Sequence, residues 1–510
     1  MSFFIGIKSC AKLYKLCSSI SGNMSKLKGI TVKKNDNFSE WYTQVVQKAE
    51  LADIRYDVQG FIVHMPWATR ITRKIYEYFE EAVEADSHEP MLLPTVIPEE
   101  SLKKEQEHAG FMPEVFWVTE AGTQKLERKF ALRPTGETQI YPMYSLWIRS
   151  HNDLPFKRYQ SRITTFRNEM QTRPFLRGRE FLFFETHDVF ETHESAMEQI
   201  KKDMSMMTDV VQNKLLIPFV FLKRPQWDKF LGADNTFTSD TLNPDGKRVQ
   251  ISSTHDLGQN FAKPFNVKFT SRDGKEQYAY QTCFGPGIWR ILASIIAIHG
   301  DDNGLVLPFE LAPIQVVIIP ILFSSKQNES KKIAAYCSTL RMQLQKSGYR
   351  VHFDARDHIS PGEKYNIWEL KGVPLRIEIG PREAASKTVT ITRRTDRERI
   401  QTKAVIKEIT KQSKVVDKHV REHAQHYFKN NTASASSLSD VKKILEQHRG
   451  FVLAPFCSTE KDGKLCADEL KAETTAYICG TPLQEKKPKN STCIVCKKPA
   501  QHIVYIAKSI

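Results

Sequence analysis

The sequence predicts an α+β domain built on an antiparallel sheet, followed by an α/β domain and a small cysteine-bearing α/β domain. Residues 157–169 and 179–190 alternate apolar and polar side chains, as strands of antiparallel sheets do. From residue 314, a continuous apolar run followed by alternating helix and strand patterns is typical of an α/β unit. Five of the nine cysteines lie in the last 54 residues, which marks a third segment.

Helix patterns flank the predicted antiparallel strands in the first 308 residues. A helix is expected over 38–48, and a hairpin pattern at 60–68 leads into a second helix. One face of this second helix is apolar and carries Ile71, Ile75, Tyr78, Phe79 and Ala82. Pro94 excludes its neighbourhood from the middle of a regular sheet. Further strands are expected at 129–134 and 219–226, and further helices at 194–215 and 288–299.

Beyond residue 308, strand and helix patterns alternate. A strand at 314–322 precedes a helix at 331–347, a strand at 349–354, a second helix, and strands at 375–380 and 387–394. A polar helical stretch from Arg399 leads to a linker rich in Ser and Asn at 430–437. The chain thus divides into a basic tail without fixed structure, the α+β domain, the α/β domain and the cysteine-bearing domain (1–36, 37–308, 309–405 and 406–510).

Composition restricts the class of protein. Lys and Arg number 74 against 59 Asp and Glu, so the net charge is +15. This balance fits either a solvated basic surface or a polyanionic partner, and nucleic acid is the foremost polyanion. No run of 18 apolar residues exists, so no membrane-spanning helix is expected. The cysteines are spaced unevenly along the chain, unlike those of a disulfide framework. This spacing favours a reducing compartment such as the cytoplasm.

The first 35 residues contain seven lysines, several serines and no acid. This composition fits a weak transit peptide or an unstructured basic tail, and Met24 is an alternative start. We favour the tail, because transit peptides are rich in arginine and this segment has none.

The hairpin at 158–190 shows the clearest chemistry. Arg167 and Glu169 stand two apart at a strand end, so both side chains point to one face. The next strand alternates so that one face carries Phe183, Glu185 and His187, and the loop between the strands carries Arg173, Arg177 and Arg179. Arg offers phosphate or carboxylate a planar fork of donors, so the pattern indicates a site for an anion beside a cation. A salt-bridged surface hairpin is the alternative.

Longer motifs occur in the order of one family. RNE at 167–169 with Arg177, and FGPGIWR at 284–290 before an apolar helix, resemble motifs 2 and 3 of class II aminoacyl-tRNA synthetases. The helix at 66–84 with Pro94 beyond it resembles motif 1, which forms the dimer in that class. Within the class, further segments resemble the prolyl-tRNA synthetase family of eukaryote-like and archaeal type. They are EWY at 40–42, RPTGET at 133–138, PFLRGREF at 174–181, HDLGQNF at 255–261 and residues 354–382. The resemblance covers residues 37–510.

This resemblance implies a binding site for L-proline. It places proline on Thr135, Glu137 and Arg167, with the pocket closed by Phe183, Glu185 and His255. The chemistry agrees, because a zwitterion needs an acid near its ammonium and an arginine near its carboxylate, and a small ring needs an aromatic wall. His187 is more simply interpreted as a structural histidine of the strand.

The resemblance also implies an ATP site. Its residues are Arg167, Glu169, Arg177, Gln250, Ser253 and Arg290. Arg167 would hold the carboxylate against the α-phosphate, Arg177 and Arg290 would neutralise the triphosphate, and Mg²⁺ would bridge the phosphates. Catalysis would then rest on positioning and charge stabilisation without a covalent enzyme intermediate. Ser253 replaces the usual threonine and keeps the hydroxyl.

Residues 309–405 resemble the class IIa anticodon-binding domain, which implies tRNA(Pro) as partner. The candidate anticodon contacts are Arg356, Lys364 and Glu369, and Glu369 would accept hydrogen bonds from a guanine edge. Solvated surface charge is the alternative interpretation of each.

The cysteines of the tail form a candidate zinc site. Cys493-Ile-Val-Cys496 has zinc-knuckle spacing, whereas eight residues separate Cys457 from Cys466, wider than usual. The tail resembles the C-terminal zinc domain of the same family, which opens with APFC, here at 454–457. One structural Zn²⁺ is expected on Cys457, Cys466, Cys493 and Cys496, with Cys479 as a buried or reactive spare. The family usually ends in a tyrosine near the active site, whereas this sequence ends in Ile510.

The prediction is a cytoplasmic, homodimeric enzyme that forms prolyl-adenylate from proline and ATP and transfers the prolyl group to tRNA(Pro). A class IIa synthetase of neighbouring specificity, such as threonyl, is disfavoured because a metal triad of Cys and two His is missing. An inactive synthetase-like RNA-binding protein is disfavoured because Arg167, Arg177 and Arg290 are retained. Only 92 residues separate Phe190 from Cys283, too few for an inserted editing domain, so no editing in cis is expected.

Overall fold

The structure is a computed structural model that describes residues 29–103, 114–322, 327–447, 450–485 and 488–510. Most of the predicted basic tail, residues 1–28, lies outside these ranges. For residues 29–36 the prediction of an unstructured tail is wrong, because these residues pack on the first domain and have a fixed structure. Lys34 is buried, and its Nζ donates hydrogen bonds to the main-chain oxygens of Ile298 (3.2 Å) and Gly300 (2.5 Å).

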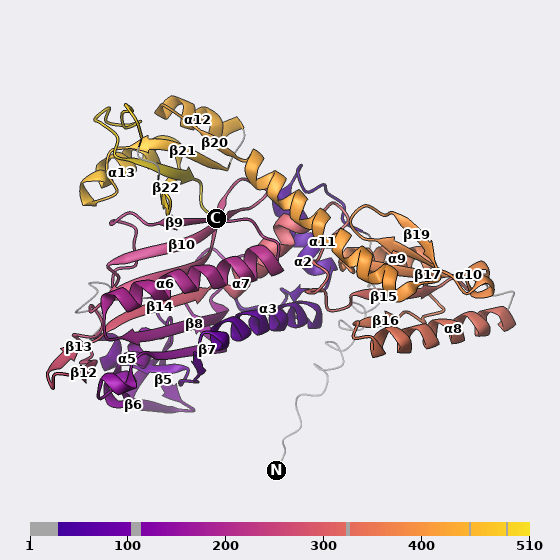
Figure 1. Cartoon of the computed structure of the whole chain (residues 1–510), viewed down its shortest axis with the longest axis horizontal. Coiled ribbons are helices and arrows are strands. Elements are labelled where there is room, and N and C mark those ends of the chain that lie inside the picture. The colour runs from indigo at the N-terminus through magenta and orange to yellow at the C-terminus, as the bar shows by residue number, and fades with distance from the viewer. Residues whose placement is uncertain (1–28, 104–113, 323–326, 448–449, 486–487) are drawn as a thin grey trace, which may run out of the picture.

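The predicted antiparallel sheet forms the centre of the first domain (Figure 1). Its strands follow the spatial order β9-β10-β11-β14-β8-β7, all antiparallel, and β3 joins β7 in parallel at the edge. The strands are β3 Glu89–Pro90, β7 Phe156–Phe166, β8 Glu180–Phe190, β9 Val220–Lys223, β10 Asn235–Leu242, β11 Arg248–Gly258 and β14 Tyr280–Pro286. Segments far apart in the chain therefore meet on one surface.

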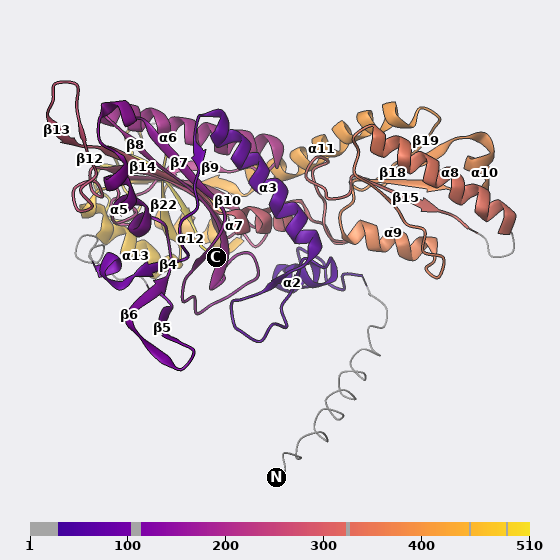
Figure 2. The same cartoon turned by 90° about the horizontal axis from the view of Figure 1, so that it is seen from below.

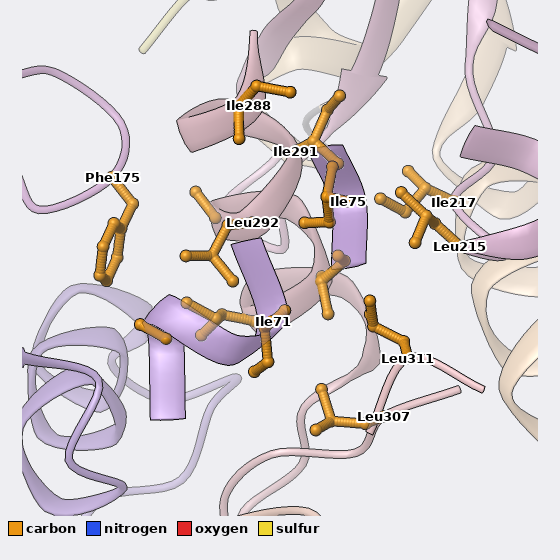
Figure 3. Close-up of a cluster of buried hydrophobic side chains, with 14 of the residues drawn as sticks. Ile71, Ile75, Phe175, Leu215, Ile217, Ile288, Ile291, Leu292, Leu307 and Leu311 are labelled. Atoms are coloured by element: carbon orange, nitrogen blue, oxygen red, sulfur yellow. The ribbon is translucent and has the colours of Figure 1, made fainter. Parts of the chain in front are cut away.

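Helix α3 (Pro66–Ala85) carries the predicted apolar face and packs on α7 (Ile288–Ser294). Ile71 and Ile75 of α3 lie in one buried cluster with Ile291 and Leu292 of α7 (Figure 3). Pro66 begins the helix, where its missing N–H costs no helical hydrogen bond. Burying a side chain of this size contributes about 1.5–3 kcal/mol, so the cluster fastens α3 beside the sheet.

The other elements of this domain flank the sheet. Helix α6 (His193–Met207) contacts β8, β11 and β14. The predicted helices at 194–215 and 288–299 each end as a π-helix, η2 (Thr208–Lys214) after α6 and η3 (Ile295–His299) after α7. A separate small sheet has the order β4-β6-β5. The remaining bounds are α2 Phe38–Lys48, β1 Ala52–Asp53, β2 Val63–His64, β4 Val96–Pro98, β5 Trp117–Ala121, β6 Gln124–Leu132, α5 Glu137–Trp147, η1 His151–Asp153, β12 Lys268–Thr270 and β13 Glu276–Tyr278.

The second domain contains a five-stranded mixed sheet, as predicted, in the order β16-β15-β17-β18-β19. The continuous apolar run forms β15 (Val316–Pro320), which is fully buried and pairs in parallel with β16 and β17. Figure 2 shows this domain beside the first, with α11 extending between them. The other bounds are α8 Gln327–Lys346, β16 Val351–Phe353, α9 Pro361–Leu370, β17 Leu375–Ile379, α10 Pro381–Ser386, β18 Val389–Arg393, β19 Arg399–Thr402 and α11 Val405–Asn430.

The third domain extends the main sheet, which the sequence did not predict. Its strand β22 pairs with β9 through Thr481–Lys223 and Pro482–Leu222, so one sheet of eleven strands spans the first and third domains. The predicted linker at 430–437 instead contains β20 (Thr432–Ser434), which pairs with β21. The other bounds are α12 Leu438–Gln447, β21 Phe451–Phe456, η4 Lys461–Gly463, α13 Lys464–Thr474, β22 Tyr477–Pro482 and β23 His502–Ala507. Among the described residues, no helix is both long and apolar enough to cross a membrane.

Candidate active site

One cavity brings together all six residues predicted for ATP. Its lining includes Arg167, Glu169, Arg177, Gln250, Ser253 and Arg290, and also Phe183, Gly285 and Trp289. These residues come from the segment between β7 and β8, from strands β8, β11 and β14, and from the first turn of α7. The antiparallel order places β11, β14 and β8 side by side, so segments more than 100 residues apart in sequence line one cavity.

The cavity has a positive wall with unused donors. Arg290 is held by a hydrogen bond from its Nη1 to the main-chain oxygen of Gln250 (3.2 Å). Burial lowers the pKa of Arg290 to about 10, and repulsion from Arg177, Arg248 and Arg167 adds to this effect. The buried Nε of Arg177 has no hydrogen-bond partner among the described residues. Such a wall is complementary to a polyanion, because an anion would both pair the donors and separate the like charges.

Arg177 has two neighbours inside the chain. Its Nη1 lies 3.7 Å from Glu169 Oε1, and its Nη2 donates a hydrogen bond to the main-chain oxygen of Ile510 (2.9 Å). Ile510 is brought there by residue 508, whose main-chain oxygen accepts a hydrogen bond from Arg248 N (2.8 Å). The third domain therefore contacts Arg177, a residue of the cavity wall, through Ile510.

Two buried carboxylates that the sequence analysis assigned to the proline pocket lie next to each other. Glu137 opens α5 and accepts a hydrogen bond from the Thr135 hydroxyl. Glu185 on β8 accepts a hydrogen bond from Gln160 Nε2 (3.0 Å). Burial raises the pKa of Glu137, and repulsion from Glu185 adds to the effect. A Cβ at Gly136 would lie 2.4 Å from Glu185 Oε1, so this close approach requires glycine.

His255 and Phe183 are the residues that the sequence analysis assigned to an aromatic and polar wall, and of the two only Phe183 lines the cavity. His255 Nδ1 lies 3.0 Å from the Thr236 hydroxyl, and burial together with repulsion from His187 lowers its pKa to about 3. The imidazole of His255 is therefore neutral near pH 7. Phe183 lines the cavity beside Gly285, where its ring lies 3.5 Å from the position of a Cβ.

His187, which the sequence analysis interpreted as structural, belongs to the same group of polar side chains. It is fully buried, with Nδ1 2.9 Å from the Tyr141 hydroxyl and Nε2 3.0 Å from Glu185 Oε2. Burial opposes charge on this imidazole, but Cys283, Tyr141 and Glu185 outweigh that effect and raise its pKa well above the usual range. The strict alternation with Phe183 and Glu185 was the signal that placed it on this face.

The four predicted zinc ligands meet in the third domain. The Sγ atoms of Cys457, Cys466, Cys493 and Cys496 all lie within 4.8 Å of one another, while Cys479 is buried elsewhere. The Sγ atoms of Cys457 and Cys466 are 3.7 Å apart, close to the roughly 3.8 Å between two thiolates on a tetrahedral zinc ion. A disulfide needs about 2.05 Å. The donor set and its spacing therefore fit Zn²⁺.

The candidate anticodon residues do not form one group. Arg356 and Lys364 line a common cavity, whereas Glu369 lines a different one. Arg356 forms two hydrogen bonds to the Asp354 carboxylate, and Lys364 is buried with its Nζ 3.0 Å from the Asp354 main-chain oxygen. The Glu369 carboxylate is bonded to Arg397. All three charges thus also serve the fold of this domain.

Three family models match the chain in the order of its domains. They are the tRNA synthetase class II core domain (G, H, P, S and T) over residues 116–299, the anticodon binding domain over 315–412 and the prolyl-tRNA synthetase C-terminal domain over 438–510. The third match begins at the start of α12. The predicted fold class is therefore confirmed for all three domains.

Relatives in sequence and structure cover nearly the whole chain. The proline–tRNA ligase of Thermofilum pendens is 51% identical over 94% of this chain and 99% of its own, and that of Thermococcus kodakarensis is 40% identical over 94% and 98%. A Giardia lamblia prolyl-tRNA synthetase in complex with prolyl-adenylate matches with a TM-score of 0.89 and 34% identity over 95% of this chain and 100% of its own. A Cryptosporidium parvum prolyl-tRNA synthetase complexed with halofuginone and AMPPNP matches with a TM-score of 0.88 and 33% identity over 96% and 98%. This chain belongs to the prolyl-tRNA synthetase family.

Proposed function

We propose that this chain activates L-proline with ATP to prolyl-adenylate and then transfers the prolyl group to tRNA(Pro), releasing AMP and pyrophosphate. The observation that carries the proposal is the convergence of Arg167, Arg177, Arg290 and Gln250 on one cavity in a chain of this family. The Giardia neighbour, solved in complex with prolyl-adenylate, supports the same intermediate.

The amino acid lies between Arg167 and the two carboxylates. Arg167 binds the proline carboxylate, because its side chain is exposed toward the cavity and forms no hydrogen bond with the described residues. Glu137 and Glu185 face the secondary ammonium, where a positive ligand relieves their mutual repulsion. Phe183 and neutral His255 form the wall of a small ring. Charge complementarity fixes the orientation of proline in this arrangement.

ATP occupies the positive wall. Arg177 and Arg290 bind its phosphates, Arg167 holds the α-phosphate against the proline carboxylate, and Gln250 and Ser253 contact the nucleoside. Glu169 brings a carboxylate to this part of the wall, where it would help to hold a Mg²⁺ ion that would neutralise charge on the phosphates. The carboxylate attacks the α-phosphorus in line and pyrophosphate leaves, so these residues act by positioning and by stabilising negative charge.

The remaining predictions complete the proposal. The cysteine cluster of the third domain holds a structural Zn²⁺, whose closed shell of four thiolates supplies no catalytic position. Arg356, Lys364 and Glu369 stay candidate anticodon contacts, and α3 stays the candidate dimer element. Placement in the cytoplasm and the lack of editing in cis also stay predictions.

ATP–pyrophosphate exchange over the amino acids tests the proposal. Proline is expected to support exchange with a much higher kcat/KM than threonine, while cysteine and alanine support measurable exchange, because a pocket discriminates smaller ligands by only about 1–3 kcal/mol. Exchange that requires threonine would favour the neighbouring specificity. If none of the amino acids supports exchange, the result would favour the inactive RNA-binding protein.

A further inference from the structure

Glu137, His187 and Cys283 form a set of metal-ligand donors inside the proposed proline pocket. Each of these residues offers one ligand atom, and the three atoms lie within 4.8 Å of one another. Cys283 Sγ lies 3.7 Å from His187 Nε2. His187 and Cys283 take no part in the proposed reaction. The structure thus contains, next to the proposed reaction site, a donor set of one carboxylate, one imidazole and one thiol.

Strand register produces this set. His187 on β8 and Cys283 on β14 are paired residues, and Cys283 is also paired with His255 on β11. Directly paired residues of antiparallel strands point to the same face, so the three side chains form a row across the sheet. Glu137 reaches this row from the first turn of α5. Central strands of a sheet are rigid, which favours a preformed site.

The donor set fits zinc. Zn²⁺ binds thiolate at about 2.3 Å and imidazole at about 2.05 Å, so a tetrahedral ion requires sulfur and nitrogen about 3.6 Å apart. The observed separation is 3.7 Å. Tyr141 lies at Nδ1 of His187, which leaves Nε2 facing both Glu185 Oε2 (3.0 Å) and Cys283 Sγ (3.7 Å). A histidine that binds a metal through one nitrogen is usually oriented in this way by a hydrogen bond at the other.

We propose that Glu137, His187 and Cys283 bind Zn²⁺ when proline is absent, and that the ion competes with proline. The inference rests on the proposed function, which assigns Glu137 to the proline ammonium. An ion on Glu137 removes the carboxylate that the ammonium needs and places positive charge beside it. Three protein ligands leave one coordination position for water, as in exchangeable zinc sites and unlike the four-cysteine site of the third domain.

Binding of Zn²⁺ to these three residues would displace protons from two of them. Burial disfavours the charged form of Cys283 and raises the pKa of its thiol. Zn²⁺ replaces the thiol proton and the Nε2 proton of His187, and both protons go to solvent. Glu185 loses its partner at His187 Nε2 but keeps Gln160, and its negative charge then offsets the ion. All three residues are buried, with Cys283 6%, Glu137 3% and His187 0% exposed.

Kinetics of the full chain test the proposal. Proline-dependent ATP–pyrophosphate exchange is measured with free Zn²⁺ held by a metal buffer, for the unchanged chain, for Cys283→Ser and for Cys337→Ser. Cys337 is an equally buried cysteine of the second domain and serves as the matched control. Zinc is expected to raise the apparent KM for proline in proportion to its concentration without changing kcat. Cys283→Ser should weaken this inhibition roughly 10- to 100-fold, and Cys337→Ser should not.

Cobalt gives a second readout that does not depend on activity. Co²⁺ bound to a thiolate absorbs strongly, and the portion of this absorption that added proline removes reports Cys283, because the tail cysteines lie in another domain. The unchanged chain is expected to show this portion and Cys283→Ser is expected to lose it. Equal zinc inhibition of the unchanged chain and Cys283→Ser, or cobalt absorption that proline leaves unchanged, would overturn the proposal. Absence of proline-dependent exchange before zinc is added would instead overturn the proposed function.

Discussion

At the scale of single residues, Arg167 has the most distinct role in the proposed reaction. Arg167→Ala is expected to lower the rate of adenylate formation about 10²- to 10³-fold, because one lost charge-assisted contact to the transition state costs about 2–4 kcal/mol. The Tm should change little, since Arg167 is exposed and its side chain forms no hydrogen bond with the described residues. Exchange kinetics and thermal unfolding measure the two effects.

Arg162→Ala provides the control for Arg167. Arg162 is an exposed arginine of the same strand whose guanidinium pairs with Glu80, outside the cavity. It should leave adenylate formation unchanged. Full activity of Arg167→Ala would contradict the assignment.

Gly136 permits a close approach of two segments. A Cβ there would lie 2.4 Å from Glu185 Oε1, and Glu185 is buried, so the carboxylate must move. Gly136→Ala is expected to raise the KM for proline by roughly tenfold or more while the KM for ATP changes less, because Glu185 faces the ammonium in the proposed site. Gly362→Ala on α9 is the control, since no atom lies within 4 Å of its Cβ position. Equal effects on both KM values would contradict this role.

At the scale of elements, α6 and β8 share a buried acidic pair on the side of the sheet away from His187. Asp203 of α6 is fully buried, and burial together with repulsion from Asp188 raises its pKa to about 8. Asp188 is paired with His88 (3.0 Å), and Asp203 accepts a hydrogen bond from Gln199 (2.9 Å). Protonated Asp203 therefore stabilises the contact between the helix and the strand.

The sign of the resulting pH dependence follows from the raised pKa. The folded state binds the Asp203 proton more tightly than the unfolded state, so its contribution to stability is full below about pH 4 and is lost as the pH rises through about 8. From about pH 6 to about pH 9, the Tm of Asp203→Asn should fall less than that of the unchanged chain. Asp209→Asn, at a half-exposed acid of η2, is the control. If the Tm falls equally with pH in the unchanged chain and in both variants, this linkage is excluded.

Helix α11 is an element whose two ends belong to different cores. Val405, Ile409, Val416 and Val420 pack in the core of the second domain, whereas Ala424 packs in the main core of the first. The predicted division at residue 405 therefore falls at the start of a helix that completes the second domain. Helical periodicity identified the helix, but only its packing shows which domain each turn stabilises.

At the scale of the whole molecule, the third domain is connected to the ATP cavity. Arg224, which directly follows β9, donates hydrogen bonds to the Cys479 main-chain oxygen (2.9 Å) and to Gln250 Oε1 (2.8 Å). Ile510 reaches Arg177. The folded third domain therefore helps to hold Gln250 and Arg177, two residues of the proposed ATP site, in position.

Loss of the proposed zinc ion from the third domain should therefore affect ATP more than proline. Cys493→Ser is expected to lower the Tm by on the order of 5 °C or more, because a structural zinc site contributes folding energy directly. It should also raise the KM for ATP more than the KM for proline. Elemental analysis, thermal unfolding and exchange kinetics measure these effects, with Cys337→Ser as control. A Cys493→Ser chain with unchanged metal content would contradict the ligand assignment.

The sequence by itself determined the local features of this protein. Alternation identified β7 and β8 and placed Phe183, Glu185 and His187 on one face, because side-chain direction in a strand depends only on neighbouring residues. The continuous apolar run at 314–322 identified a strand covered on both faces. Motifs carried by short segments, read together with the family resemblance, predicted six of the residues that line the cavity proposed for ATP.

Only the tertiary structure decided how distant segments meet. The pairing of His187 with Cys283 joins residues 96 positions apart, and the pairing of β22 with β9 joins two domains. Strand register between such segments depends on the packing of the whole sheet, which no local pattern contains. For the same reason, the sequence assigned residues 29–36 to a tail and 430–437 to a linker, whereas burial of Lys34 and pairing of β20 give both segments fixed structure.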